Sequence, residues 1–216
     1  LYVSTPSNPT GRVLSREMLE ALAEWARRRV LWLLSDEVYE DYVYTGEHVS
    51  LGTVAPERTV AFYSFSKAYG TAGTRVGYLT GPRELVDQAH KVGVHSTYHA
   101  SRPGQQAALH ALQKGAAWVD EARASYRAAG ADAAAALGRP APEGSCFLFV
   151  DVRPHLDERG LLGFLEDCLD DGVVLSPGTS SGSDYEGWVR LCYTAVPPDQ
   201  AATAVRLLAR RLRTAT

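Results

Sequence analysis

Short apolar runs alternate with amphipathic helical segments through the first half of the chain, and this alternation limits the fold more than any other feature. Val30–Leu34 is a continuous apolar run, which is typical of a strand covered on both faces, and Thr59–Phe65 and Val76–Thr80 are two further strand candidates. Helices are expected at Leu14–Arg28 and Arg83–Lys91. Strands that alternate with helices predict an α/β domain, in which helices flank a mixed, mostly parallel sheet.

The first of these helices carries signals for its start and for its buried face. Ser15 is the expected N-cap, because a serine side chain can accept a hydrogen bond from an amide of the first turn. The apolar residues expected to face the core are Met18, Leu22, Trp25 and Ala26.

A stretch rich in glycine and proline, GRPAPEGS at 138–145, interrupts the second half of the chain. A long alanine-rich helix is expected before it, at Trp118–Leu137. The elements expected after it are a strand at Cys146–Val152, a helix at Leu161–Leu169, strands at Val173–Ser176 and Trp188–Thr194, and a helix at Pro198–Arg213. This order predicts a second, smaller α+β domain. We therefore expect a large domain at 1–115, a connecting helix at 116–140 and a small domain at 141–216.

Composition and charge exclude several classes of partner. A net charge of −3 gives no electrostatic reason to expect nucleic acid or an anionic membrane, and the longest apolar runs are too short to span a bilayer. The three cysteines are widely spaced, without a metal-binding pattern, and predict thiols in a reducing compartment, the cytoplasm. His95 and His99 lie four residues apart but lack a third ligand, so no metal site is expected.

The chain begins at Leu1, without an initiator methionine, in what looks like the last half of a strand. A strand edge without a partner would expose backbone groups. We therefore expect the chain to be a piece of a longer protein, or to be completed by a second chain.

One lysine stands out in the stretch YSFSKAYGTAGTRVGYLTG at 63–81. Of 22 basic residues only Lys67, Lys91 and Lys114 are lysines, so the chain nearly always uses arginine where it needs positive charge. A partly desolvated lysine can become a neutral nucleophile, whereas arginine stays protonated. Lys67 is therefore either a reactive amine or an ordinary surface lysine.

The neighbours of Lys67 favour the first interpretation. Ser64 and Ser66 place two hydroxyls beside it, and Arg75 follows in a glycine-rich turn. Hydroxyls and an arginine fork can hold a phosphate group. The glycine pattern is neither GxGxxG nor a P-loop, which argues against nicotinamide and nucleotide sites.

Two other segments place polar residues near predicted strand ends, where ligands gather in α/β sheets. SDEVY carries Asp36 and Tyr39 just after a buried strand. SNPTG carries Asn8 before a proline. Taken alone, Asp36 could be a helix cap and Asn8 part of an ordinary turn. A lysine, a phosphate cradle and a carboxylate together match the needs of pyridoxal phosphate.

The chain resembles the class I/II aminotransferases, which are pyridoxal-phosphate enzymes of fold type I. The matching segments, in family order, are SNPTG at 7–11, SDEVYEDY at 35–42, SFSKAYGTAGTRVGY at 64–78, SPG at 176–178 and VRLCYT at 189–194. The resemblance implies that 1–115 is the C-terminal part of a large cofactor-binding domain that is incomplete at its N-terminus.

The resemblance also implies a role for each candidate. Lys67 would form an imine with the cofactor and move the proton at the substrate's alpha carbon, and Asp36 would pair with the pyridine nitrogen. Asn8 and Tyr39 would contact the ring's phenolic oxygen. Ser64, Ser66 and Arg75 would hold the phosphate. Arg190, together with Asn8, would bind the substrate.

The implied reaction is transfer of an amino group from an L-amino acid to a 2-oxo acid, in a homodimer. Two alternatives stay open. The same lysine and aspartate would serve elimination, replacement or cyclisation at the alpha carbon. A truncated, non-catalytic relative would keep the fold alone.

Overall fold

The computed structural model describes residues 1–214, which form two compact units. The first unit holds residues 1–7 and 12–123, and the second holds residues 8–11 and the chain from 124 onward. No helix among the described residues is long and apolar enough to cross a membrane.

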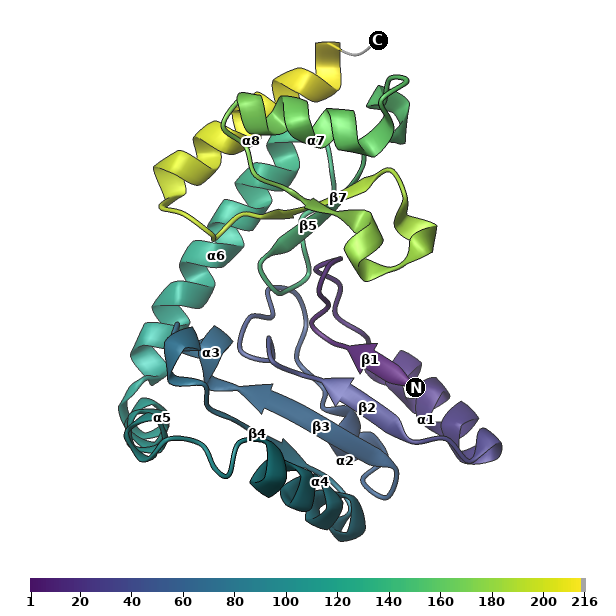
Figure 1. The fold of residues 1–216 in the computed structure, drawn as a ribbon, viewed down its shortest axis with the longest axis vertical. Helices are drawn as coiled ribbons and strands as arrows, with labels where there is room; N and C mark the ends of the chain where they lie inside the picture. Colours follow the sequence, from purple (N-terminus) through teal and green to yellow (C-terminus); the bar gives the residue numbers. More distant parts are fainter. Residues whose placement is uncertain (215–216) are drawn as a thin grey trace. The chain divides into compact units, whose positions relative to one another are not determined.

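A four-stranded sheet forms the centre of the first unit, and its strands lie side by side in chain order (Figure 1). The strands are β1 (Tyr2–Ser4), β2 (Leu33–Asp36), β3 (Thr59–Ser64) and β4 (Gly77–Thr80). β1, β2 and β3 are parallel, and β4 runs antiparallel to β3. The predicted α/β class with a mixed, mostly parallel sheet is confirmed.

The start of β2 differs from the prediction because α1 (Arg16–Arg29) ends with a left-handed residue. The amide of Val30, which has a φ of 54°, donates to carbonyls of the last helical turn. Val30 therefore closes the helix instead of opening the strand. The N-cap prediction is confirmed, since the Ser15 side chain accepts from the Met18 amide at 3.3 Å.

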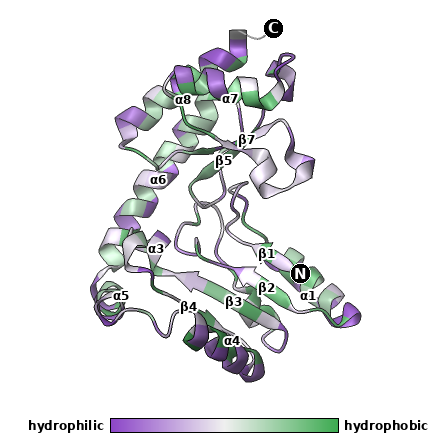
Figure 2. Cartoon of the chain, viewed as in Figure 1, coloured by the Kyte–Doolittle hydropathy of each residue, from purple (hydrophilic) through white to green (hydrophobic). Residues whose placement is uncertain are grey.

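The prediction for the buried face of α1 is confirmed for Ala26, which is buried, and for Leu22, which packs against the core, but not for Met18 and Trp25. Leu19, Ala23 and Ala26 are fully buried, whereas Met18 and Trp25 are 39% exposed. Small alanines let the helix approach the sheet closely, so the face that packs is not the one with the largest apolar residues. In Figure 2, green hydrophobic residues occur in α1 and in the strands, whereas much of α4 is purple and hydrophilic.

The core of this layer continues into the strand and the short helix beside it. Leu33 of β2 and Leu51, the first residue of α2 (Leu51–Val54), are fully buried in the same cluster as Leu19. Burying each leucine contributes about 1.5–3 kcal/mol. This cluster packs α1 and α2 against the start of β2.

The remaining helices of the first unit are α3 (Phe65–Ala68), α4 (Arg83–Ser96) and α5 (Arg102–Lys114). α4 continues one turn beyond the prediction. His95 lies in its last turn and His99 lies after its end, so these two histidines do not share a helix face. α6 (Ala116–Ala136) begins in the first unit and ends in the second.

The second unit contains a three-stranded antiparallel sheet in the order β5 (Phe147–Asp151), β7 (Trp188–Cys192) and β6 (Ser176–Pro177). The strand expected at 173–176 is reduced to the two-residue β6. The Val173 amide donates to the Cys168 carbonyl at the end of α7 (Gly160–Asp170), so it is not available to a strand partner.

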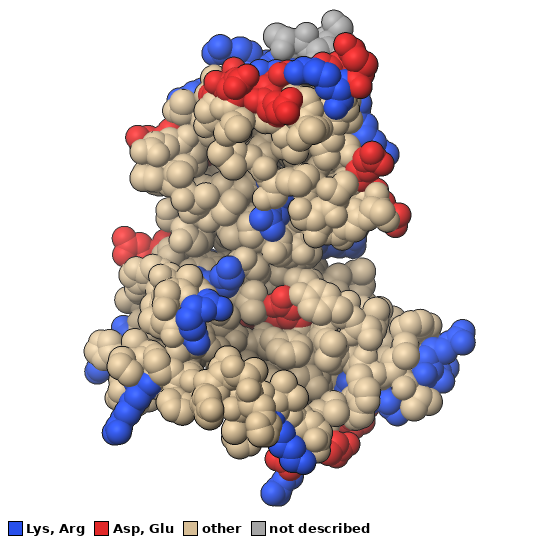
Figure 3. Space-filling view, in the orientation of Figure 1, with Lys and Arg blue, Asp and Glu red and all other residues tan. Residues whose placement is uncertain are grey.

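α8 (Pro198–Thr214) completes the second unit and pairs with α7 through charged side chains. The Arg211 guanidinium lies 2.9 Å from Asp167 and 2.6 Å from Asp171, and Arg159 also binds Asp167. Acidic and basic groups accordingly lie side by side at this end of the unit (Figure 3). Water and salt screen such exposed pairs, so each contributes little to stability.

Candidate active site

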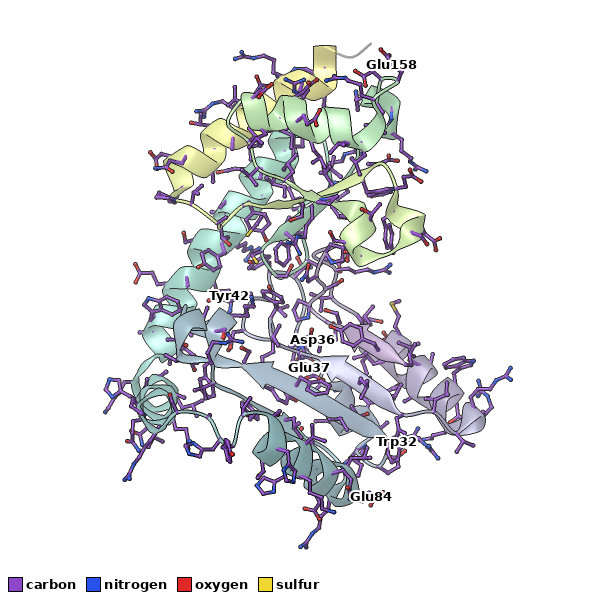
Figure 4. The ribbon with its side chains drawn as sticks, viewed as in Figure 1. Trp32, Asp36, Glu37, Tyr42, Glu84 and Glu158 are labelled. Atoms are coloured by element: carbon purple, nitrogen blue, oxygen red, sulfur yellow. The ribbon has the colours of Figure 1, made fainter. Side chains whose placement is uncertain are left out.

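The C-terminal ends of β2 and β3 bring several predicted site residues to one edge of the sheet. Asp36 is the last residue of β2 and pairs with Phe62 of β3, whose last residue is Ser64. Because the two strands are parallel, both residues lie at the same sheet edge. Figure 4 shows Asp36 where β2 ends.

Lys67 lies in α3, directly after β3, and its side chain is exposed. Its Nζ is 5.8 Å from the centre of the Tyr39 ring, and Tyr39 is only 5% exposed. Tyr42 holds the α3 backbone, because its hydroxyl donates to the carbonyls of Lys67 and Ala68 at 3.2 and 2.9 Å (Figure 4). The amine is therefore accessible while the backbone beneath it is anchored.

The Asp36 carboxylate has hydrogen bonds on both oxygens. Its Oδ1 accepts from the Val38 amide at 3.3 Å, and its Oδ2 accepts from the Tyr2 hydroxyl at 2.5 Å. Burial, and then the hydrogen bond and charge of Asp36, raise the pKa of Tyr2. Each carboxylate oxygen has two lone pairs, so Asp36 can accept a further donor such as a protonated ring nitrogen.

Donors for an anion follow β3. The Ser64 side chain accepts from the Ser66 amide at 3.2 Å, which caps α3 and leaves the Ser64 proton available to donate. Arg75 has a left-handed backbone, and its Nη1 donates to the Ala72 carbonyl at 2.9 Å. That bond uses one of its five N–H groups, and its side chain is exposed.

The second unit brings two other predicted residues together. Arg190 of β7 donates from Nη1 to Asn8 Oδ1 at 2.8 Å and from Nη2 to Ser176 Oγ at 3.0 Å. Its guanidinium lies over the Phe147 ring, 4.6 Å from the ring centre. Its Nε is buried and makes no hydrogen bond within residues 1–214. An oriented guanidinium with an unused donor is suited to bind a carboxylate.

Glu37 is the main residue that the sequence interpretation missed. It directly follows Asp36 and is fully buried. Its carboxylate accepts hydrogen bonds from Ser35 Oγ (2.8 Å), Ser50 Oγ (3.1 Å), the Leu51 amide (3.1 Å) and the Tyr63 hydroxyl (3.1 Å), and His48 Nε2 lies 2.9 Å away. Figure 4 shows Glu37 beside Asp36 at the sheet edge.

Side-chain alternation explains the burial of Glu37. Ser35 lies in β2 and Glu37 directly follows it, so these two side chains, two residues apart, point to the same side of the extended chain, whereas Asp36 points to the other side. A sequence signal for this burial is lacking, because an acidic residue after a strand is normally solvated. Burial alone would raise the pKa of Glu37, but the bonds from His48, Ser35 and Ser50 hold that pKa below its ordinary value.

The pKa of Glu40 shifts in the opposite direction to that of Glu37. Burial, with help from the nearby charge of Asp41, raises the pKa of Glu40 to about 7. His48 opposes this shift, and Glu37 adds to it. The site edge therefore holds one carboxylate that stays ionised and one that titrates near neutral pH.

Comparison with known proteins adds a family match. The model of the family described as aminotransferase class I and II matches residues 1–208. An aspartate/prephenate aminotransferase from Thermus thermophilus is 37% identical over 89% of this chain, and an aromatic-amino-acid aminotransferase from Thermococcus litoralis is 34% identical over 89%. The chain spans about half the length of these curated relatives, 51% and 52%.

Solved structures agree with the sequence match. A Thermus thermophilus aspartate aminotransferase with maleate is 36% identical with a TM-score of 0.87, over 98% of this chain and 56% of that one. An aromatic aminotransferase from Pyrococcus horikoshii is 28% identical with a TM-score of 0.91, over 99% of this chain and 60% of that one.

Replacing Glu37 by Gln should lower the free energy of unfolding by about 1–3 kcal/mol, because an amide cannot accept all the hydrogen bonds that the buried carboxylate accepts. Glu47→Gln is the matched control, since Glu47 is exposed in the same connection. Urea denaturation measures both variants. Equal stability of the two would contradict a structural role for the Glu37 network.

Glu40 should make stability depend on pH. Its pKa in the folded chain, about 7, lies above the ordinary value of 4.5, so its contribution is fully present below pH 4.5 and is lost as pH rises towards and through 7. As pH rises through this range, the free energy of unfolding of the wild type should fall relative to that of Glu40→Gln. Urea denaturation between pH 4 and 8 measures it, and a constant difference would refute the assignment.

Proposed function

Because the chain belongs to the aminotransferase class I and II family, we propose that it acts as a pyridoxal-phosphate-dependent aminotransferase. It transfers an amino group from an L-amino acid to a 2-oxo acid. The observation that carries this proposal is the exposed Lys67 amine over the Tyr39 ring, at the sheet edge where Asp36 ends β2.

The donor set of this edge fits pyridoxal phosphate. Ser64, Ser66 and Arg75 would hold the phosphate, because hydroxyls and a guanidinium are its usual donors. Lys67 would hold the cofactor covalently, and Asp36 would accept a hydrogen bond from the ring nitrogen. When bound, the cofactor withdraws electrons from the substrate's alpha carbon.

Each residue then has a definite task. Asp36 would pair with the ring nitrogen and keep it protonated, and the hydrogen bond from Tyr2 orients the carboxylate. Lys67, once displaced by substrate, moves the proton at the alpha carbon as a general base and acid. Tyr39 and Asn8 would donate to the ring's phenolic oxygen.

Arg190 would bind the alpha-carboxylate of both substrates, with Asn8 as its neighbour. The bonds to Asn8 and Ser176 orient the guanidinium before substrate arrives, which reduces the entropy lost on binding.

We also propose the wider organisation that the family resemblance implies. Residues 1–115 belong to a cofactor-binding domain, 116–140 connect, and 141–216 form the small domain. The enzyme is a homodimer in the cytoplasm, a compartment that agrees with three cysteines that are not paired in disulfides.

Lys67→Ala should abolish both covalent cofactor attachment and amino transfer, because no other described lysine lies in α3. Lys91→Ala, an exposed lysine of α4, is the matched control. Borohydride reduction followed by peptide mass measurement locates the attachment, and product assay with added 2-oxo acid measures transfer. Cofactor attachment at another lysine, or release of ammonia without amino transfer, would contradict the proposal.

Arg190→Lys should raise KM for the amino acid and for the 2-oxo acid by about 10- to 100-fold, since lysine cannot form a bidentate pair with a carboxylate. Arg206→Lys is the control, because Arg206 is an exposed arginine of α8. Steady-state kinetics measure both variants. An unchanged KM in Arg190→Lys would exclude Arg190 as the carboxylate ligand.

A further inference from the structure

A small cavity opens in the first unit, between the connection that follows β2 and the place where the end of β3 pairs with the start of β4. Its volume is about 100 Å³. Two acidic and four aromatic residues line most of it: Glu40, Asp41, Tyr63, Phe65, Tyr69 and Tyr78. Pockets for whole drug-sized ligands commonly measure about 300–1,000 Å³, so this cavity has room for one small head group.

The four aromatic rings form a continuous wall. Tyr63 of β3 and Tyr78 of β4 are cross-strand partners, and their rings stack with centres 4.7 Å apart and planes 16° from parallel. The Phe65 ring lies 5.9 Å from that of Tyr69 and 6.0 Å from that of Tyr78. The face of an aromatic ring carries partial negative charge, so a cation within about 6 Å of a ring centre is attracted to it.

The two carboxylates that border the cavity have no counter-ion. Glu40 and Asp41 are partly buried, and their side chains make no hydrogen bond and no ion pair within residues 1–214. The basic groups whose charge reaches Asp41 are Arg123 and His48, and both are engaged elsewhere. His48 lies 2.9 Å from Glu37, and Arg123 pairs with an aspartate of its own helix at 2.8 Å.

Charges that leave water without a partner carry a cost in free energy. Burial raises the pKa of Asp41, and burial together with the charge of Asp41 raises that of Glu40 to about 7. The charges of both carboxylates also add to the raised pKa values of Tyr69 and Tyr78, in agreement with the cavity geometry. A cation held between the rings and the carboxylates would remove this cost.

We propose that this cavity binds a guanidinium group. A guanidinium is flat and weakly hydrated, so it can stack on an aromatic face while its N–H groups donate to two carboxylates. An ammonium group is more strongly hydrated and loses more on entering a cavity with aromatic walls. The guanidinium belongs either to a free guanidino compound or to an arginine side chain of another protein.

The cavity lies on the side of the sheet edge that carries Glu37. The Tyr63 hydroxyl donates to the Glu37 carboxylate at 3.1 Å, whereas the Asp36 side chain points to the other side of the chain. Among the proposed cofactor ligands, only Ser64 also borders the cavity. Guanidinium binding is therefore measured directly, without reliance on the cofactor or on amino transfer.

The test titrates the protein with methylguanidinium, with its neutral isostere methylurea and with methylammonium, and measures binding by calorimetry. A pH of 8 keeps Glu40 largely ionised. Methylguanidinium should bind with a Kd on the order of 1 mM, which is within reach of a ligand with so few heavy atoms. Methylurea and methylammonium should bind at least about tenfold more weakly. NMR signals of the Tyr63, Tyr69 and Tyr78 rings should shift with methylguanidinium.

Variants separate the contribution of charge from that of the rings. Glu40→Gln and Asp41→Asn should each weaken methylguanidinium binding about tenfold, because each removes a charged acceptor. Glu47→Gln is the matched control, since Glu47 is exposed in the same connection. Tyr78→Leu should weaken binding about three- to fivefold through loss of one ring. Its control is Tyr98→Leu, at a tyrosine that is 80% exposed. Urea denaturation checks that each variant is folded.

The outcomes decide the proposal independently of the proposed function. No binding of methylguanidinium, equal affinity for methylurea, or unchanged affinity in both Glu40→Gln and Asp41→Asn would overturn the guanidinium site. Titration with free arginine and with a glycine-flanked arginine peptide then identifies the source. Tighter binding of free arginine supports a guanidino compound as the occupant, and tighter binding of the peptide supports a protein partner. Failure of both would overturn a natural guanidino ligand.

Discussion

The buried carboxylate of Glu37 is the interaction on which the first unit depends. Removing a carboxylate from water costs several kcal/mol unless its lone pairs are satisfied, and Glu37 satisfies them with donors from three separate segments. Ser35 belongs to β2, Leu51 begins α2, and Tyr63 belongs to β3. Separating any of these segments would leave the buried carboxylate without one of its donors, so the hydrogen bonds keep this edge of the sheet together. Asp36, Ser64 and Lys67 lie at the strand ends of the same edge.

Asp36 ends β2 and Glu37 directly follows it, and their side chains point to opposite sides because an extended chain alternates its faces. Glu37 points into the packed side and stabilises, whereas Asp36 points to the opposite side and accepts donors from Tyr2 and Val38. A satisfied buried carboxylate next to Asp36 gives the candidate site a rigid base. The exposed Lys67 amine then stands on a backbone that Tyr42 anchors.

Arg190 of β7 is held in place by contacts within the second unit. Its guanidinium donates to Asn8 and Ser176 and lies over the Phe147 ring. These contacts come from three different segments of the chain, so the orientation of Arg190 depends on the folded second unit.

The sequence by itself determined the α/β class, the order of most elements and the family, because hydrophobic period, cap residues and motif order are local in the chain. The tertiary structure alone decided the buried face of α1, the left-handed residue Val30 that ends α1, and the burial of Glu37. These depend on which distant segments pack together, and a local pattern carries no information about that. The sequence could therefore identify Lys67 and Asp36 as candidates, while only the fold showed which residues contact them.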